Sequence, residues 1–178
     1  IDLEVARGQL LVVVGSNGSG KTTLIKVLAT LTRPDQAKIT VAGFDPTKEG
    51  ENVRRNIGVL THDPLLYDGL TGRENLKFFA KMFSLDDIDY RITNSAEKMG
   101  VLPWLDQRVG TMSHGMKKRV SISRTLLHDP LILLLDEPES GLDQEALSMF
   151  HDLISDSTRT ILMTTHDLKS VVGTRQEV

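Results

Sequence analysis

The chain has 178 residues, 39% of them hydrophobic and 25% charged, which is the composition of a folded globular domain rather than of a disordered chain. Its 21 basic and 24 acidic residues give a formal net charge of −3, which argues against a uniformly basic, nucleic-acid-binding chain. Because cysteine is absent, a disulfide framework, a thiolate zinc site and a cysteine nucleophile are excluded. The longest apolar runs have the length of strands, so we expect no membrane-spanning helix.

The chain alternates between short apolar runs and helical patterns. Four runs rich in Val, Ile and Leu predict strands at Leu10–Val14, Ile57–Leu60, Leu131–Leu135 and Thr160–Thr164. Three of these runs lack polar alternation, which is typical of parallel strands covered on both faces. Apolar residues at helical spacing form two stripes, one of Leu24, Val27, Leu28 and Leu31 and one of Leu147, Phe150 and Ile154. This order predicts an α/β fold with a mainly parallel sheet flanked by helices.

Residues 71–127 differ from the rest because they contain helical patterns and no convincing strand. The patterns lie at Glu74–Met82, Tyr90–Met99 and Gly115–His128. We therefore predict a single domain over residues 1–178, with an α/β core formed by 1–70 and 128–178 and an inserted α-helical subdomain at 71–127. A basic run, Lys117–Arg119, is interpreted as a solvated helix face.

A phosphate-binding loop is predicted directly after the first strand. The sequence GSNGSGKTT matches the pattern G-x-x-x-x-G-K-[ST], with a strand before it and an amphipathic helix after it. Glycines let successive N–H groups turn toward phosphate oxygens, and the helix N-terminus adds partial positive charge. Lys21 is expected to reach the β- and γ-phosphates, and the Thr22 hydroxyl is a suitable Mg²⁺ ligand. The residues expected to contact the nucleotide are Gly15, Ser16, Asn17, Gly18, Ser19, Gly20, Lys21, Thr22 and Thr23.

Two later strands also end in residues with catalytic chemistry. Asp136 and Glu137 follow an apolar run, at the end of the strand where open α/β sheets bind ligands. In a phosphate-loop enzyme Asp136 would hold the magnesium shell and Glu137 would activate the attacking water. His166 ends another strand and is expected to hydrogen-bond the γ-phosphate and that water. A solvated acidic turn and a structural histidine are the alternatives.

These segments, in this order, resemble the ATP-binding-cassette ATPase family over nearly the whole chain. By this resemblance Gly15–Thr23 is the Walker A loop, Asp136 ends Walker B, Glu137 is the catalytic base, and His166 is the switch histidine. Ser140–Asp143 corresponds to the D-loop. The resemblance implies a phosphate-loop ATPase core of the RecA type, with ATP and Mg²⁺ as ligands.

The resemblance also implies how the domain assembles. Ser113-His114-Gly115-Met116 stands where the family has its L-S-G-G-Q signature, so Ser113 and Gly115 are expected to contact ATP held by a partner subunit in a head-to-tail dimer. Ser113 could also be only a helix N-cap. The helical subdomain is expected to dock on membrane-spanning permease subunits, at the cytoplasmic face of the cell membrane.

Four departures from the family pattern qualify this interpretation. His62 stands where the family usually has a glutamine that contacts Mg²⁺, and imidazole is a poor direct ligand for that ion, so His62 is expected to act through a water. His114 and Met116 replace a glycine and the glutamine of the signature. The sequence has no aromatic residue in 1–14, where the family stacks adenine, and it ends twelve residues after His166, so we expect a fragment truncated at both ends.

The sequence therefore predicts the transport-coupled ATPase subunit of an exporter-type ABC transporter, with no nucleic acid as partner. Two alternatives stay open. One is a cassette ATPase that acts on DNA or ribosomes, although the long coiled-coil insertion usual for such proteins is not seen. The other is an ATP-sensing module with little hydrolysis, which the unusual His62 and His114 would favour.

Overall fold

The chain folds into two compact units in the computed structural model, which describes residues 2–155 and 158–166. The sheet unit comprises Ile1–His62, Pro130–Pro138 and Ser157–Val178, and the helical unit comprises Asp63–Asp129 and Glu139–Asp156. The helical unit thus contains the expected insertion and also residues 139–156, which the sequence analysis had assigned to the α/β core. The core expected over 128–178 includes 167–178, which lie outside the described residues.

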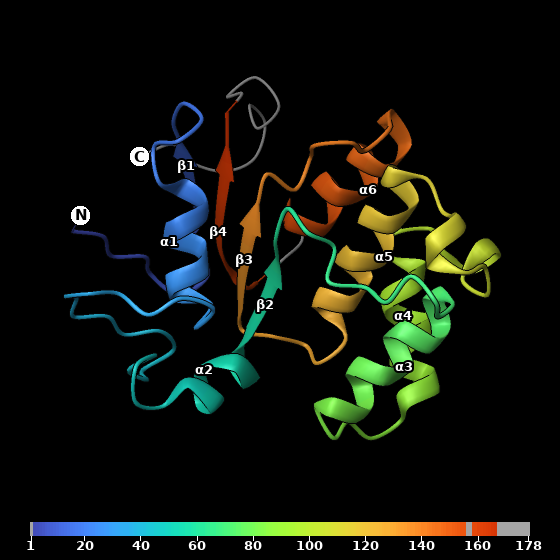
Figure 1. Ribbon diagram of the computed structural model, residues 1–178, viewed down its shortest axis with the longest axis horizontal. Coiled ribbons are helices and arrows are strands. Elements are labelled where there is room, and N and C mark those ends of the chain that lie inside the picture. Colours follow the sequence, from blue (N-terminus) through green and yellow to red (C-terminus); the bar gives the residue numbers. More distant parts are fainter. Residues whose placement is uncertain (1, 156–157, 167–178) are drawn as a thin grey trace. The chain divides into compact units, whose positions relative to one another are not determined.

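The sheet unit is built on a four-stranded parallel sheet, as predicted. Its strands are β1 (Leu10–Val14), β2 (Ile57–Leu60), β3 (Ile132–Asp136) and β4 (Thr160–Thr165). They lie in the order β1-β4-β3-β2, and each neighbouring pair is parallel. Figure 1 shows the four arrows pointing the same way. The expected strands are confirmed, with β3 shifted by one residue and β4 one residue longer.

Two helices belong to the sheet unit. Helix α1 (Lys21–Leu28) packs against β3 and buries Ile25 completely. It ends earlier than predicted, because Ala29 is already its C-cap and Leu31 is 54% exposed. Helix α2 (Gly50–Asn56) was not predicted, since it buries one side chain, Val53, and therefore shows no apolar stripe.

The hydrophobic core of the sheet unit is formed by side chains from the strands, from both helices and from the connecting segments. It contains Leu11, Ile25, Ala29, Val41, Val53, Ile57, Leu134 and Leu162.

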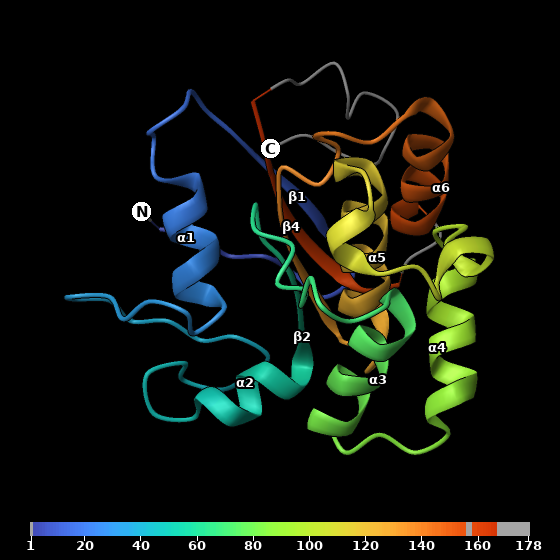
Figure 2. The same ribbon diagram turned by 45° about the vertical axis from the view of Figure 1, so that its right-hand side comes forward.

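The helical unit contains the longer helices. These are α3 (Gly72–Met82), α4 (Ile88–Glu97), α5 (His114–Leu126) and α6 (Gln144–Ser155), with 3-10 turns η1 at Leu102–Trp104 and η2 at Val109–Thr111. Helices α3, α4 and α5 contact one another pairwise (Figure 2). Thr71 begins α3 with a reciprocal capping box, in which its hydroxyl accepts from the Glu74 N–H and Glu74 accepts from the Thr71 N–H. The bond that the Glu74 carboxylate accepts from the Thr71 N–H favours the ionised carboxyl and lowers the pKa of Glu74.

The basic run on α5 is not a solvated face, so that interpretation was wrong. Lys118 and Arg119 are buried, and Lys117 forms an ion pair with Asp68 at 2.9 Å. The Arg119 Nε donates to the main-chain oxygen of Met99 at 2.8 Å, and its guanidinium lies 5.9 Å from the centre of a tryptophan ring. Distant segments of the helical unit therefore supply partners that the local charge pattern does not reveal.

Arg124, also on α5, is only partly buried. Its guanidinium lies over the Phe79 ring, 5.0 Å from the ring centre. Burial disfavours the charged form and lowers the pKa of Arg124 to about 10. Arg124 therefore stays protonated at neutral pH. None of the helices within residues 2–155 and 158–166 combines the length and apolarity needed to cross a bilayer.

Candidate functional site

The sheet brings three of the predicted site segments to one edge. Because the four strands are parallel, their carboxyl ends lie at the same edge, where Val14 pairs with Thr165 and Asp136 pairs with Thr164. The phosphate loop follows β1, Glu137 follows β3, and His166 follows β4. His62 lies one residue further from its strand, two residues after the end of β2, and is exposed. This is the edge at which open parallel sheets bind ligands.

The loop between β1 and α1 has the backbone of an anion cradle. Gly18 and Gly20 adopt left-handed conformations, with φ of 81° and 96°. L-residues with a Cβ disfavour this region, so glycine is required there. Gly20 is also the N-cap of α1, and no side chain caps the first N–H groups of that helix. Exposed N–H groups at a helix N-terminus attract phosphate oxygens.

The positive charge of the loop comes from Lys21, which is buried. Its ammonium Nζ donates to the main-chain oxygen of Gly15 at 2.6 Å and to that of Ser16 at 3.1 Å. The lysine is thus held inside the loop rather than extended into solvent. A Cβ on Gly15 would come within 2.7 Å of the Ser19 hydroxyl, so the loop is also closed tightly on itself.

Asp136 is fixed by a residue that the sequence analysis did not single out. Its carboxylate is 2% exposed and accepts a 2.6 Å hydrogen bond from the Thr164 hydroxyl on the neighbouring strand. The same Thr164 hydroxyl accepts from the Glu137 N–H at 3.2 Å. The apolar run that predicted β4 gave no sign of this role, because pairing between strands cannot be read from one segment.

Glu137 has an unusual backbone and a histidine beside it. Its φ of 45° is left-handed, a conformation that costs a non-glycine residue about 1–3 kcal/mol and is concentrated at functional sites. The Glu137 side chain is partly exposed, and its Oε2 lies 3.5 Å from the Nδ1 of His166. The structure therefore places the expected base and the expected switch histidine next to each other.

The oxygen donors at this edge suit magnesium better than a softer metal. Asp136 offers a carboxylate and Thr22 an exposed hydroxyl, both hard ligands. Residues 2–155 and 158–166 contain no group of three or more His, Cys, Asp or Glu that could hold a metal ion. Magnesium that is held by one or two protein ligands, phosphates and water needs no such cage, so the residues fit a magnesium–nucleotide complex.

The signature segment belongs to the helical unit. Ser113 is the N-cap of α5, with its hydroxyl accepting from the Met116 N–H at 3.2 Å, so the capping role considered from the sequence is present. The His114 ring lies against the Cα of Gly141, where an added Cβ would be 2.5 Å from the ring Nδ1. A Cβ on Gly115 would be 2.9 Å from the main-chain oxygen of Gly141. The signature segment and the expected D-loop are therefore packed together within one unit.

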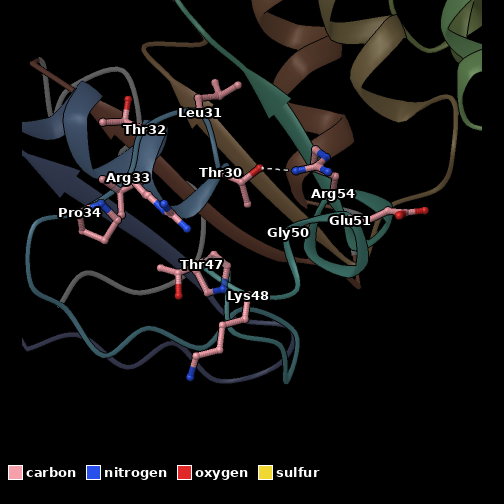
Figure 3. Close-up of a pocket in the computed structure, with 12 residues that line it drawn as sticks. Thr30, Leu31, Thr32, Arg33, Pro34, Thr47, Lys48, Gly50, Glu51 and Arg54 are labelled. Atoms are coloured by element: carbon pink, nitrogen blue, oxygen red, sulfur yellow. Dashed lines mark hydrogen bonds between the residues drawn. The ribbon is translucent and has the colours of Figure 1, made fainter.

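A cavity of about 510 Å³ lies at the other end of α1 (Figure 3). It is lined by residues that follow α1 and by the start of α2, and the Arg54 guanidinium donates across it to the Thr30 hydroxyl at 3.1 Å. Lys48 and Glu51 point in different directions. Since the phosphate loop precedes α1, this cavity is not part of the candidate site.

Comparison with known proteins identifies the family. The family model described as ABC transporter matches residues 1–140. The chain belongs to the ABC transporter family. It is 38% identical over 177 residues to the ABC transporter ATP-binding protein NatA of Bacillus subtilis, covering 96% of this chain and 72% of NatA. It is 37% identical to the daunorubicin resistance ATP-binding protein DrrA3 of Streptomyces coeruleorubidus, covering 95% of this chain and 55% of DrrA3.

Solved structures agree with this membership. The ABC transporter protein cbiO1 of Clostridium perfringens, described as part of the cbiONQ complex, superposes with a TM-score of 0.81 at 28% identity, covering 96% of this chain and 72% of cbiO1. A dimeric ATP-binding cassette bound to ADP and phosphate has a TM-score of 0.83 at 21% identity, covering 94% and 79%, and shows the shared fold. The ABC ATPase fold expected from the sequence is thus confirmed. The chain spans 55% of the length of DrrA3 and 57% of the length of BcrA of Bacillus licheniformis, which is less than the share of NatA that it spans.

Proposed function

We propose that this ABC cassette binds magnesium–ATP at the carboxyl edge of its sheet and hydrolyses it to drive transport through permease subunits. The observation that carries the proposal is the meeting of four groups at one edge: the cradle with its buried Lys21, the carboxylate of Asp136, and the neighbouring side chains of Glu137 and His166. Phosphoryl transfer depends mainly on positioning and electrostatic stabilisation, which such an arrangement supplies.

The proposal assigns a separate role to each residue of the site. The loop N–H groups and the Lys21 ammonium hold the β- and γ-phosphates, and Asp136 and Thr22 orient the magnesium ion, which neutralises charge on those phosphates when bound. Glu137 takes a proton from the attacking water. His166, 3.5 Å from the Glu137 carboxylate, holds that carboxylate and the γ-phosphate in place. His62 is assigned to the same shell through a water rather than to direct coordination.

Dimerisation completes the site in this proposal. Ser113 is the N-cap of α5 and Gly115 is its second residue, and this N-terminus would face the γ-phosphate of ATP bound to the partner subunit. His114 and Met116 differ from the family signature, so the partner contact would rely on Ser113, Gly115 and main-chain N–H groups. A dimer with two shared sites predicts that activity depends on protein concentration.

An exposed apolar patch supports the permease as partner. It lies on the helical unit and contains Tyr67, Phe78 and Met82, each 42–59% exposed; Phe78 and Met82 are four residues apart on α3 and so share one face of that helix. Tyr67 and Phe78 pack edge to face with ring centres 5.1 Å apart. Apolar side chains clustered on a surface mark interaction sites, and the names of the relatives NatA and DrrA3, an ABC transporter protein and a drug-resistance protein, support an export system.

The test is the magnesium-dependent ATPase rate of the purified protein over a wide range of protein concentration. We expect the rate per subunit to rise with concentration. Glu137→Gln should retain ATP but lose at least about 100-fold in turnover, as expected for loss of a general base. The matched control Glu145→Gln, on exposed α6 surface, should keep wild-type turnover. Turnover that survives Glu137→Gln would refute the assignment of the base.

The phosphate loop is tested by binding. Lys21→Ala should weaken ATP affinity, while Lys26→Ala, in the last turn of the same helix, should not. Measurable ATP binding with no turnover above that of Glu137→Gln, at any concentration, would instead favour an ATP-sensing module. Such an outcome would point to the departures at His62 and His114.

A further inference from the structure

We propose that Thr164 is a positioning residue that aligns Asp136 and Glu137 through a single hydroxyl group; this inference rests on the ATPase function proposed above. Thr164 lies on β4, directly beside Asp136 on β3 in the strand register, and is fully buried. Its Oγ1 donates to Asp136 Oδ1 at 2.6 Å and accepts from the Glu137 N–H at 3.2 Å. One side chain thus contacts both acidic residues of the site.

The chemistry of a hydroxyl explains why one residue can serve both. A threonine oxygen has one donor hydrogen and two acceptor lone pairs, so donation to Asp136 and acceptance from Glu137 are compatible. A hydrogen bond to an ionised carboxylate is short and strong, as the 2.6 Å distance indicates. Because Thr164 occupies Oδ1, the rotation of the Asp136 carboxylate is fixed and Oδ2 is left for another ligand.

The contact with Glu137 acts on the backbone. Glu137 has a left-handed φ of 45°, and its N–H is shared between the main-chain oxygen of Thr164 at 3.1 Å and the Thr164 hydroxyl at 3.2 Å. Strained conformations persist only where the surroundings impose them. Thr164 therefore supplies part of the constraint that aims the Glu137 side chain, and it acts on the reaction through Glu137 and Asp136 rather than on ATP.

Burial strengthens this coupling. Asp136 is 2% exposed, and a buried carboxylate requires hydrogen-bond partners to replace water. Loss of the Thr164 hydroxyl would leave Asp136 free to rotate and would weaken its hold on magnesium. Outer-shell partners of metal-binding carboxylates typically change metal affinity or activity by about 10- to 100-fold when they are removed.

The experiment compares Thr164→Val with Thr164→Ser and with Thr160→Val. Valine keeps the branched shape and removes the hydroxyl, whereas serine keeps the hydroxyl. Thr160 is the matched control, because it lies on the same strand at the other end and its hydroxyl accepts one main-chain hydrogen bond, from Gly8 at 3.0 Å. Four quantities are measured on the purified protein: kcat, KM for ATP, nucleotide affinity with Mg²⁺ or with EDTA, and Tm.

We expect Thr164→Val to lower kcat by about 10- to 100-fold and to raise the Mg²⁺ concentration needed for half-maximal nucleotide binding. Its nucleotide affinity in EDTA should be unchanged, because the phosphate loop is intact. Thr164→Ser should restore both kcat and the Mg²⁺ requirement. Thr160→Val should lower Tm to a similar extent while keeping kcat and the Mg²⁺ requirement of the wild type.

Two results would overturn the proposal. In the first, Thr164→Val and Thr160→Val lose activity equally and in step with Tm, which would make Thr164 a purely structural residue. In the second, Thr164→Ser is as impaired as Thr164→Val. If the wild type binds nucleotide but does not hydrolyse it, the proposed ATPase function fails, and the shift in Mg²⁺ requirement of Thr164→Val still decides the role of Thr164.

Discussion

Replacement of Asn75 by alanine should destabilise the helical unit and release Tyr67 from the apolar patch. Asn75 is completely buried on α3. Its Oδ1 accepts from the Tyr67 N–H at 2.8 Å, and its Nδ2 donates to the main-chain oxygens of Tyr67 at 3.1 Å and Thr71 at 2.9 Å. The side chain thus ties the segment before α3 to the helix itself.

The magnitude follows from these contacts. Three hydrogen bonds at about 1 kcal/mol each give a loss of about 3 kcal/mol. Alanine has a higher helix propensity than asparagine, which returns roughly 0.6 kcal/mol. We therefore expect Asn75→Ala to lower the free energy of unfolding by about 2 kcal/mol. Asn75→Asp keeps the shape but turns an acceptor toward two carbonyl oxygens, so it should be at least as unstable.

The assay is urea unfolding followed by the fluorescence of Trp104, which is the single tryptophan of the chain and lies in the helical unit. Gln107→Ala is the control, because it also removes side-chain hydrogen bonds in that unit, but at an exposed position where water replaces them. A loss for Asn75→Ala that is no larger than that of the control would refute the reasoning.

Two further predictions concern the helical unit. Gly141→Ala should lower the free energy of unfolding by about 1–2 kcal/mol, because Gly141 has a left-handed φ of 80° and the new Cβ would push the His114 ring away. Unchanged urea unfolding curves, together with an unmoved NMR signal of the His114 imidazole, would contradict this prediction. Asp106 accepts a hydrogen bond from Arg73, which lowers the pKa of Asp106 below its ordinary value of 3.8. Its stabilising effect is therefore present above pH 3.8 and lost as the pH falls through the lowered pKa. Because Asp106 is 71% exposed and its charge is screened by water, Asp106→Asn should lower the free energy of unfolding by less than about 1 kcal/mol at neutral pH. In urea unfolding, the difference in stability between Asp106→Asn and the wild type should become smaller in acid and in 1 M salt. A difference that grows in acid would contradict the stated direction of the pKa shift.

The sheet and the phosphate loop could be predicted because their signals are local. Uninterrupted apolar runs gave the strands within a residue, and the glycine pattern gave the loop with Lys21 at its end. The buried position of Arg119 could not be predicted, since its hydrogen-bond partner is the main-chain oxygen of Met99 on another segment. Thr164 was missed for the same reason, because its partners are Asp136, at the end of the neighbouring strand, and Glu137, directly after that strand.

The strand order has a consequence for the way the chain folds. The helical segments α3, α4 and α5 follow one another in the sequence and contact one another, so they can form as soon as that stretch of chain exists. The sheet behaves differently, because β1 pairs with β4, the last strand among residues 2–155 and 158–166. Strands β2 and β3 also pair although the helical segments separate them in the sequence. During synthesis β1 therefore cannot pair with β4 until β4 has been made. Until then its main-chain groups on that edge are unpaired and can bind a chaperone or pair with a wrong strand.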